Sequence, residues 1–485
     1  MFAALACGGA AGLAFPEANA WWLMPVALAG AIALAASAGS VRSAVMRAWF
    51  SGAGYFLVAA HWLVPNVGPG LVAIAGLLAL TWLPWGAVAF YALRGPLSPG
   101  RIAIAMLAIP AAFVVGEYVR SWEYLGGPWA LAGASLWRTR AVIGLAALGG
   151  VWLLSFIVVA TSAALSAALM PTGAPLLRIG AVLAAVAMVA FGAIASVLAP
   201  GVERAGSVSM AGVQPGPDLG AEERLEAALT ATEGLAPSDL VVWGESSVGF
   251  DLRVPDVLGR IEAASAVASA RVLANFDARE GSGGIYKSSV LVDETGVIGR
   301  YDKLRLVPFG EYIPLRPLLG WLGSISEAAD EDRRRGKEPT LLDAGVMVGP
   351  LICFESTFPD MTRRLVDLGA DLIVVQSATS SFQGSWAPEQ HASLAAIRAV
   401  ESGRSVVHAT LTGVSAAFDP EGHELLWVPT HRRGTYHVEA PISDTITPYV
   451  RFGDWVPVAC LGGLLIWAAM RAWRTGGART GTHPL

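Results

Sequence analysis

A short apolar run ends on a cysteine and a carboxylate in the stretch Leu351-Ile352-Cys353-Phe354-Glu355-Ser356. Such a run is typical of a buried β-strand, which would deliver the Cys353 thiol to the edge of a sheet. A second run, Leu240-Val241-Val242-Trp243-Gly244, leads in the same way to Glu245, and Lys303 follows a third run at Tyr301-Asp302. This order of carboxylate, ammonium and thiol, each beside a β-like run, indicates both the fold and the chemistry.

The composition separates membrane segments from a water-facing domain. The chain has 485 residues, of which 54% are hydrophobic and 15% charged, whereas a typical globular chain is roughly 25% charged. We expect N-terminal transmembrane helices in residues 1–200, a catalytic domain at 203–445, a C-terminal transmembrane helix at 455–473 and a cytoplasmic tail at 474–485. The net charge of −5 argues against nucleic acid as a partner.

Apolar stretches of about 20 residues can cross a bilayer as helices. The candidates lie at 2–17, 20–39, 50–64, 70–92, 102–119, 141–169, 177–199 and 455–473. With the N-terminus inside the cell, most loop arginines fall on the cytoplasmic side, and the loop at 117–140 is the exception. This distribution predicts a multi-pass protein of the plasma (inner) membrane whose domain at 203–445 is extracytoplasmic.

Strands and helices alternate within residues 203–445, which predicts a layered α/β sandwich. We expect strands at 207–213, 239–243, 271–276, 371–376, 406–410 and 415–419, hairpins at 286–301 and 341–353, and helices at 221–233, 254–269, 358–368 and 389–401. Residues 312–336 break this alternation. They form either a helix packed on the domain or a lid that dips into the membrane surface.

Three residues could supply the parts of a thioester mechanism. A free thiol has a pKa of about 8.5 and is mostly protonated at neutral pH. Glu245 could take its proton and later return it to a leaving group, while Lys303 could stabilise an oxyanion. Taken singly, each residue has a plainer interpretation as core cysteine, paired carboxylate or surface lysine. Together they predict a catalytic triad of Glu245, Lys303 and Cys353.

The motifs around these residues resemble those of the apolipoprotein N-acyltransferases, a membrane-anchored family of the nitrilase superfamily. The resemblance covers nearly the whole chain. It is carried by Val242-Trp243-Gly244-Glu245-Ser246, by the long segment from Lys303 to Pro314, by Ile352-Cys353-Phe354-Glu355, by residues 398–404 and 447–455, and by the loop with Gly126, Pro128 and Trp129.

The resemblance implies a transmembrane helical bundle joined to a nitrilase-like αββα sandwich, with neither a cofactor nor a metal. Cys353 would take an acyl chain from a phospholipid and pass it, through a thioester, to the N-terminal amine of the diacylglyceryl-cysteine of a lipoprotein. Glu245 would act as base and then acid, and Lys303 would stabilise the oxyanion. Supporting roles would fall to Glu311 and Glu355, and substrate contacts to Trp129, Phe354 and Tyr312. Trp129 has a simpler interpretation as an interfacial anchor.

The sequence departs from the family pattern at several positions. Phe354 stands where the family usually has tyrosine, Lys287 where it has asparagine, and residues 376–382 replace its Ser-Asn-Asp-x-Trp-Phe segment. The tryptophan usual after the first soluble strand is missing at 216–221. These departures leave two alternatives open: a membrane-tethered amidase of nitrilase type, in which water resolves the thioester, and a non-catalytic relative that binds lipoproteins.

Overall fold

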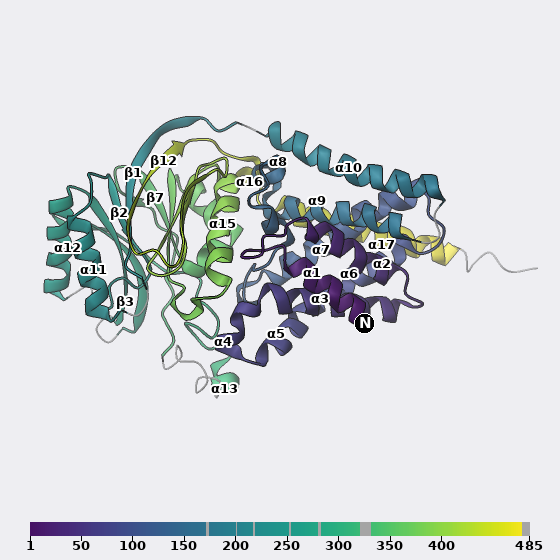
Figure 1. Cartoon of the computed structure of the whole chain (residues 1–485), viewed down its shortest axis with the longest axis horizontal. Helices are drawn as coiled ribbons and strands as arrows, with labels where there is room; N and C mark the ends of the chain where they lie inside the picture. The colour runs from purple at the N-terminus through teal and green to yellow at the C-terminus, as the bar shows by residue number, and fades with distance from the viewer. Residues whose placement is uncertain are drawn as a thin grey trace, which may run out of the picture.

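The computed structural model describes residues 1–170, 174–199, 201–216, 219–251, 254–279, 283–320 and 331–477. A helical bundle occupies one end of the molecule and a two-sheet domain the other, and the last helix returns the chain to the bundle (Figure 1). Residues 478–485 of the expected cytoplasmic tail lie outside the described residues, and the last helix extends to Gly477.

The bundle contains five helices, among the described residues, that are long and apolar enough to cross a membrane: Gly70–Leu93, Pro99–Arg120, Ala146–Leu169, Pro175–Val197 and Trp455–Trp473. The main helices are α1 (Phe2–Gly12), α2 (Leu23–Ala36), α3 (Val41–Ala59), α5 (Gly70–Leu78), α6 (Leu83–Leu93), α7 (Pro99–Arg120), α9 (Ala146–Leu169), α10 (Pro175–Val197) and α17 (Trp455–Gly477). The shorter helices α1 and α2, and the 19-residue α3, occupy the other three stretches predicted to span. Helix α3 begins nine residues before the predicted start because the Ser40 hydroxyl accepts the Ser43 N–H and caps it.

The second domain has two six-stranded sheets, ordered β12-β1-β2-β3-β4-β5 and β11-β10-β9-β8-β7-β6. The strands of the first are β1 (Arg204–Gln214), β2 (Leu240–Trp243), β3 (Arg271–Arg279), β4 (Ile285–Asp293), β5 (Gly296–Asp302) and β12 (Gly434–Ser443). Those of the second are β6 (Leu342–Asp343), β7 (Met347–Ile352), β8 (Leu372–Ser377), β9 (Ser405–Thr410), β10 (Ser415–Phe418) and β11 (Glu424–Val428).

Helices cover the outer face of each sheet, and the predicted αββα sandwich beside a helical bundle is confirmed. Helices α11 (Ala221–Glu233) and α12 (Pro255–Ala268) pack on the first sheet. Helices α14 (Pro359–Asp367) and α15 (Ala387–Ser402) lie on the second, between it and the bundle (Figure 1). A core of alternating aliphatic side chains, including Val242, Leu273 and Val374, joins the two sheets.

Helix α9 has a kink at its contact with the sandwich. Gly149 and Gly150 leave the helical conformation, and Gly150 has a φ of +67°. A β-carbon at Gly150 would lie 2.6 Å from the Tyr449 ring, so only glycine allows this approach. The kink frees the N–H of Val151, which donates to Glu401 Oε1 of α15 at 2.6 Å. The kink therefore joins the membrane bundle to the helix behind the second sheet.

In the described part of the segment at 312–336, the structure has one short helix, α13 (Arg316–Leu319). Leu315, which precedes the helix, and Leu318 within it are largely exposed. Residues 321–330, on which the choice between a packed helix and a lid depends, lie outside the described residues.

Candidate active site

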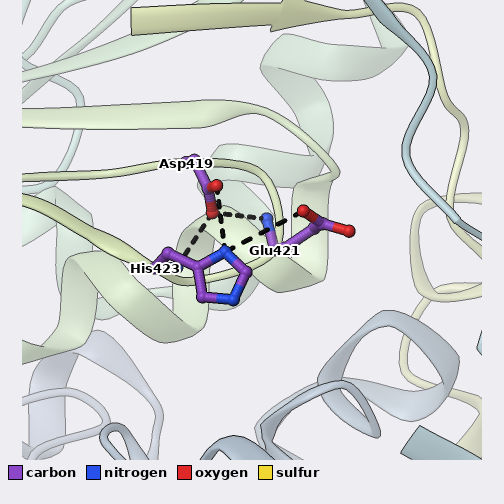
Figure 2. A group of neighbouring side chains, drawn as sticks. All are labelled: Asp419, Glu421 and His423. Atoms are coloured by element: carbon purple, nitrogen blue, oxygen red, sulfur yellow. Dashed lines mark hydrogen bonds and ion pairs between the residues drawn. The ribbon is translucent and has the colours of Figure 1, made fainter. Parts of the chain in front are cut away.

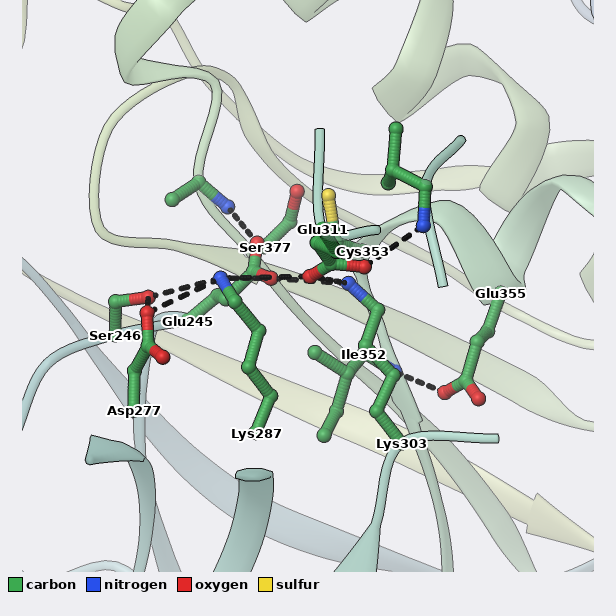
Figure 3. Close-up of polar contacts among 12 residues, drawn as sticks. Glu245, Ser246, Asp277, Lys287, Lys303, Glu311, Ile352, Cys353, Glu355 and Ser377 are labelled. Carbon is green, nitrogen blue, oxygen red and sulfur yellow. Dashed lines mark hydrogen bonds and ion pairs between the residues drawn. The ribbon is translucent and has the colours of Figure 1, made fainter. Parts of the chain in front are cut away.

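The structure brings Glu245, Lys303 and Cys353 together at one end of the sandwich. Each of them lies at the end of a strand, as predicted: Lys303 directly follows β5, Cys353 directly follows β7, and Glu245 follows β2 after Gly244. Lys303 Nζ lies 3.2 Å from Glu245 Oε1, and the Cys353 thiol lies close enough to both residues for their charges to shift its pKa. Figure 3 shows these groups converging from separate segments.

The backbone turns sharply at both Cys353 and Ser246. Cys353 has a φ of +51° and begins a short 3-10 turn, and Ser246, directly after Glu245, has a φ of +58°. Left-handed backbone is uncommon for residues with a β-carbon and is held only when the surroundings determine it. Here the turn at Cys353 is held by the Ser356 hydroxyl, which donates to the Cys353 carbonyl at 2.9 Å. The nucleophile candidate thus lies on a tight corner between strand and turn.

Glu355 connects the turn at Cys353, through hydrogen bonds, to the segment that carries Lys303. Its Oε2 accepts the N–H of Ile352 at 2.8 Å. Its Oε1 accepts the N–H groups of Leu304 at 2.7 Å and Arg305 at 3.0 Å, and the Tyr301 hydroxyl at 2.7 Å. The carboxylate is fully buried, and it sets the distance between the thiol and the ammonium from behind the site.

Lys303 is completely buried and has two carboxylate partners. Its Nζ lies 2.7 Å from Glu311 Oε1 in addition to its contact with Glu245. Glu311 is itself positioned by the N–H of Val307, which donates to Oε2 at 2.8 Å. Burial disfavours the positive charge of Lys303, but the attraction of the two carboxylates is stronger than this effect. The pKa of Lys303 therefore lies well above its ordinary value. Lys303 is therefore a fixed cation and cannot serve as a general base.

The resting site holds an ionised carboxylate and a protonated thiol. Burial disfavours the charge on Glu245, yet the ammonium groups of Lys287 and Lys303 lower its pKa to about 2. Burial and the nearby charge of Glu245 raise the pKa of Cys353 to about 12, and Lys303 only partly opposes them. The thiolate must therefore form by proton transfer to Glu245 as a substrate is attacked.

The three predicted substrate-contact residues lie in different settings. The Trp129 ring packs between Trp62 of the bundle, at 5.3 Å, and His391 of α15, at 5.5 Å, so it lies beside the site. Phe354 is buried edge-on against Phe358 at 4.9 Å. The guanidinium carbon of Arg335 lies over the Tyr312 ring, 5.3 Å from the ring centroid. Of the three, Trp129 is the one that joins the bundle to the active-site end of α15.

Two neighbours of the triad were missed as site residues. Lys287, noted only as a departure, places its Nζ 2.9 Å from Glu245 Oε1. Ser377 lies beside Cys353 and contacts His391, whose Nδ1 lies 3.2 Å from the serine hydroxyl. Burial lowers the pKa of His391 to about 4, so this imidazole is neutral. A signal for Lys287 was present, because the chain has only three lysines among its 33 basic residues.

A separate group of metal-ligand types lies in the turn between β10 and β11 (Figure 2). Asp419 Oδ1 accepts the N–H groups of Glu421 and His423 at 3.0 and 2.8 Å. Its Oδ2 faces His423 Nδ1 at 3.1 Å and Arg204 at 3.2 Å, and Arg204 also reaches Glu421 at 3.5 Å. These oxygens are engaged within the turn, so we interpret the group as turn stabilisation.

Comparison with known proteins agrees with this geometry. The family model of the apolipoprotein N-acyltransferase N-terminal domain matches residues 7–164, and that of the carbon-nitrogen hydrolases matches residues 204–445. The apolipoprotein N-acyltransferase of Azotobacter vinelandii is 32% identical and aligns over 96% of this chain and 94% of its own. The apolipoprotein N-acyltransferase of Pseudomonas syringae pv. tomato is 30% identical and aligns over 97% of this chain and 96% of its own.

Among solved structures, an amidase from Nesterenkonia sp. aligns with 52% of this chain and 94% of its own, at 20% identity and a TM-score of 0.38. The assignment rests instead on the family models and the full-length relatives. With the five apolar helices, these relatives identify a multi-pass membrane protein. The chain belongs to the apolipoprotein N-acyltransferase family.

Proposed function

We propose that this protein transfers an acyl chain from a phospholipid to the N-terminal amine of the diacylglyceryl-cysteine of a lipoprotein, through a thioester on Cys353. The observation that carries the proposal is the convergence of a thiol, a carboxylate and a buried ammonium at the end of the sandwich. The names of the full-length relatives support the lipoprotein acceptor.

In the first half-reaction, Cys353 Sγ attacks the ester carbonyl carbon of the phospholipid while its proton passes to Glu245. The carbonyl oxygen becomes an oxyanion, and the Lys303 ammonium stabilises it. The tetrahedral intermediate collapses to the thioester, and protonated Glu245 gives its proton to the departing lysophospholipid oxygen. Glu311 keeps Lys303 in place, and Glu355 holds the two reacting segments at their spacing.

In the second half-reaction, the lipoprotein amine attacks the thioester carbonyl. Glu245 takes a proton from the attacking nitrogen and returns it to the Cys353 sulfur as the C–S bond breaks and the amide forms. Lys303 again stabilises the oxyanion. The contacts of Trp129 with Trp62 and His391 support an acyl path between the bundle and the site, with Phe354 and Tyr312 shaping its borders.

We place the protein in the plasma (inner) membrane with the sandwich outside the cytoplasm. The distribution of basic residues in the short loops supports this orientation. The corresponding domains are the helices of residues 1–200, the catalytic sandwich of 203–445, the returning helix of 455–473 and a cytoplasmic tail from residue 474.

The experiment is to incubate detergent-purified protein with phospholipid that carries a labelled acyl chain. We expect a labelled, hydroxylamine-sensitive adduct that is absent from Cys353→Ala. Cys460→Ala is the matched control, because Cys460 lies in α17 away from the site, and it should keep the adduct. A labelled adduct in Cys353→Ala would refute the nucleophile assignment.

Adding a diacylated lipopeptide should then move the label to an amide on the lipopeptide. Release of labelled free fatty acid alone would instead identify a hydrolase of amidase type. An absence of any adduct in folded parent protein would favour the non-catalytic alternative.

A further inference from the structure

Lys287 brings a second ammonium group into the active site. It lies on β4, its side chain is only 13% exposed, and its Nζ lies 2.9 Å from Glu245 Oε1. Lys303 lies 3.2 Å from the same oxygen, while Glu245 Oε2 accepts the N–H of Ala378 at 3.0 Å. Figure 3 shows both ammonium groups pointing at the carboxylate. The proposed base thus has two cations on one oxygen.

The charge of Lys287 is balanced by a carboxylate on the neighbouring strand. Asp277 of β3 is its direct partner in the antiparallel pairing, and its Oδ2 lies 3.4 Å from Nζ. Asp277 in turn pairs with Arg333 at 3.2 Å through Oδ1. The charges alternate from Arg333 through Asp277, Lys287 and Glu245 to Lys303. A buried ammonium with such partners keeps its proton, and the neighbouring carboxylates raise the pKa of Lys287 against the effect of burial.

The choice of lysine here is specific. The chain uses 30 arginines and three lysines, Lys287, Lys303 and Lys337, and the first two meet at Glu245. The Lys303 N–H also donates to the Lys287 carbonyl at 2.9 Å, so the two residues are fixed to each other by their backbones. A compact ammonium fits between Glu245, Asp277 and the Ser246 hydroxyl, where a planar guanidinium would need more room.

We propose that Lys287 is a positioning residue that holds Glu245 ionised in acid solution and so extends acyl-enzyme formation to lower pH. The inference rests on the proposed role of Glu245 as the base. An opposite charge at this distance lowers the pKa of a carboxyl group by about 1 to 3 units. Lys287 therefore keeps the base deprotonated at pH values where a carboxyl beside Lys303 alone would begin to take up a proton. The same attraction makes Glu245 a weaker base.

Other charged or titratable groups also face Glu245, and all of them remain in place in Lys287→Asn. Lys303 and Glu311 approach from the segment after β5, Asp277 from β3, Cys353 from the turn after β7, His391 from α15 and His408 from β9. Both histidines are buried with lowered pKa values, so they stay neutral across most of the range measured.

The test measures alkylation of Cys353 by iodoacetamide in the full-length, detergent-purified protein between pH 2 and 8, a range that reaches down to the lowered pKa of Glu245, and follows it on the Cys353 peptide by mass spectrometry. This probe reports thiolate formation without a lipid donor. In Lys287→Asn we expect the acid limb of the rate profile to move up by about one pH unit or more. The plateau rate should equal or exceed that of the parent, because a carboxylate with a higher pKa is a stronger base.

Two variants separate charge from structure. Lys287→Arg keeps the positive charge in a bulkier group, so its acid limb should lie nearer to that of the parent than to that of Lys287→Asn. Lys337→Asn removes the same charge from an exposed position and should leave the profile unchanged. If Lys287→Asn does not fold, the double variant Lys287→Asn/Asp277→Asn removes both members of the cross-strand pair. Because the negative charge of Asp277 also acts on Glu245, this variant should show an upward shift of smaller size.

Coincident acid limbs in the parent and Lys287→Asn would overturn the proposal, as would an equal shift in Lys337→Asn. Glu245→Gln distinguishes this failure from failure of the proposed mechanism. If Cys353 of Glu245→Gln is still alkylated and acylated at the parental rate, Glu245 is not the base. Both the proposed mechanism and the proposed role of Lys287 would then be refuted. If Glu245→Gln is inactive and Lys287→Asn keeps the parental acid limb, only the proposed role of Lys287 is refuted, and Glu245 remains the proposed base.

Discussion

Glu355 makes no contact with a reacting atom in the proposed mechanism, yet it fixes where two of those atoms lie. It receives four hydrogen bonds: one from the strand end before Cys353, and three from Tyr301, Leu304 and Arg305 around Lys303. All four of its partners are donors. The site therefore requires a group that only accepts hydrogen bonds. An ionised carboxylate meets this requirement, whereas an amide also carries an NH₂ donor.

We predict that Glu355→Gln lowers the rate of acyl-enzyme formation at least about tenfold and lowers the melting temperature. The new NH₂ group would face N–H donors, and each buried donor left unpaired costs about 1–3 kcal/mol. The measurements are the rate of label incorporation from phospholipid and thermal unfolding in detergent.

Tyr301→Phe is the milder control for this prediction. It removes one of the four hydrogen bonds and should cost only about 1 kcal/mol of stability, with a rate within about threefold of the parent. A rate in Glu355→Gln equal to that of Tyr301→Phe would show that the carboxylate does not position the site.

At the level of elements, the sequence predicted the inner strands and two of the four edge strands, β5 and β6. Strands β2, β7 and β8 are continuous apolar runs, and the runs before Glu245 and Cys353 marked the site residues that follow them. The two strands that were missed, β11 and β12, are both edge strands. Pro441 interrupts the alternation of β12, and proline is tolerated there because an edge strand has unpaired positions.

The contribution of Lys287 could not be predicted, for a related reason. Its contact with Asp277 is set by the register of β3 against β4, and its contact with Glu245 by the parallel pairing of β2 with β3. Local periodicity reveals a strand but not which residues of two strands lie opposite one another. Only the scarcity of lysine in the chain pointed to this position.

Helix α15 contains a buried ion pair next to the kink in α9. Arg398 and Glu401 are each 1% exposed and lie 3.1 Å apart, and Glu401 also accepts the N–H of Val151 from the kink. Removing one partner of a buried pair leaves an uncompensated charge and typically costs about 3–5 kcal/mol, whereas replacing both is often close to neutral.

We predict that Glu401→Gln and Arg398→Met each lower the melting temperature of the detergent-purified protein. The double variant Arg398→Met/Glu401→Gln should recover most of that loss, since glutamine still offers Val151 an acceptor and no charge is left alone. Thermal unfolding of the four proteins completes the cycle. Additive losses in the double variant would show that the two charges do not depend on each other.

On the scale of the whole molecule, one apolar core extends from the bundle into the sandwich. It includes Ile109 and Val151 of the bundle, Ile397 of α15 and Val375 of β8. Such a shared core fixes the orientation of the sandwich relative to the membrane helices, so the active site and the bilayer keep one relative position. The side of the membrane on which the sandwich lies then decides which lipoproteins can reach Cys353.

We predict that the sandwich faces outward, and cysteine labelling in spheroplasts tests this. In a Cys353→Ala parent, the remaining Cys7 and Cys460 lie in bundle helices, and a membrane-impermeant maleimide should leave this protein unlabelled. Glu294→Cys, at the exposed turn between β4 and β5, should react in intact spheroplasts. Arg178→Cys, exposed near the start of α10 on the expected cytoplasmic side, should react only after lysis. The reverse pattern would place Cys353 in the cytosol, away from exported lipoproteins, and would contradict the proposed acceptor.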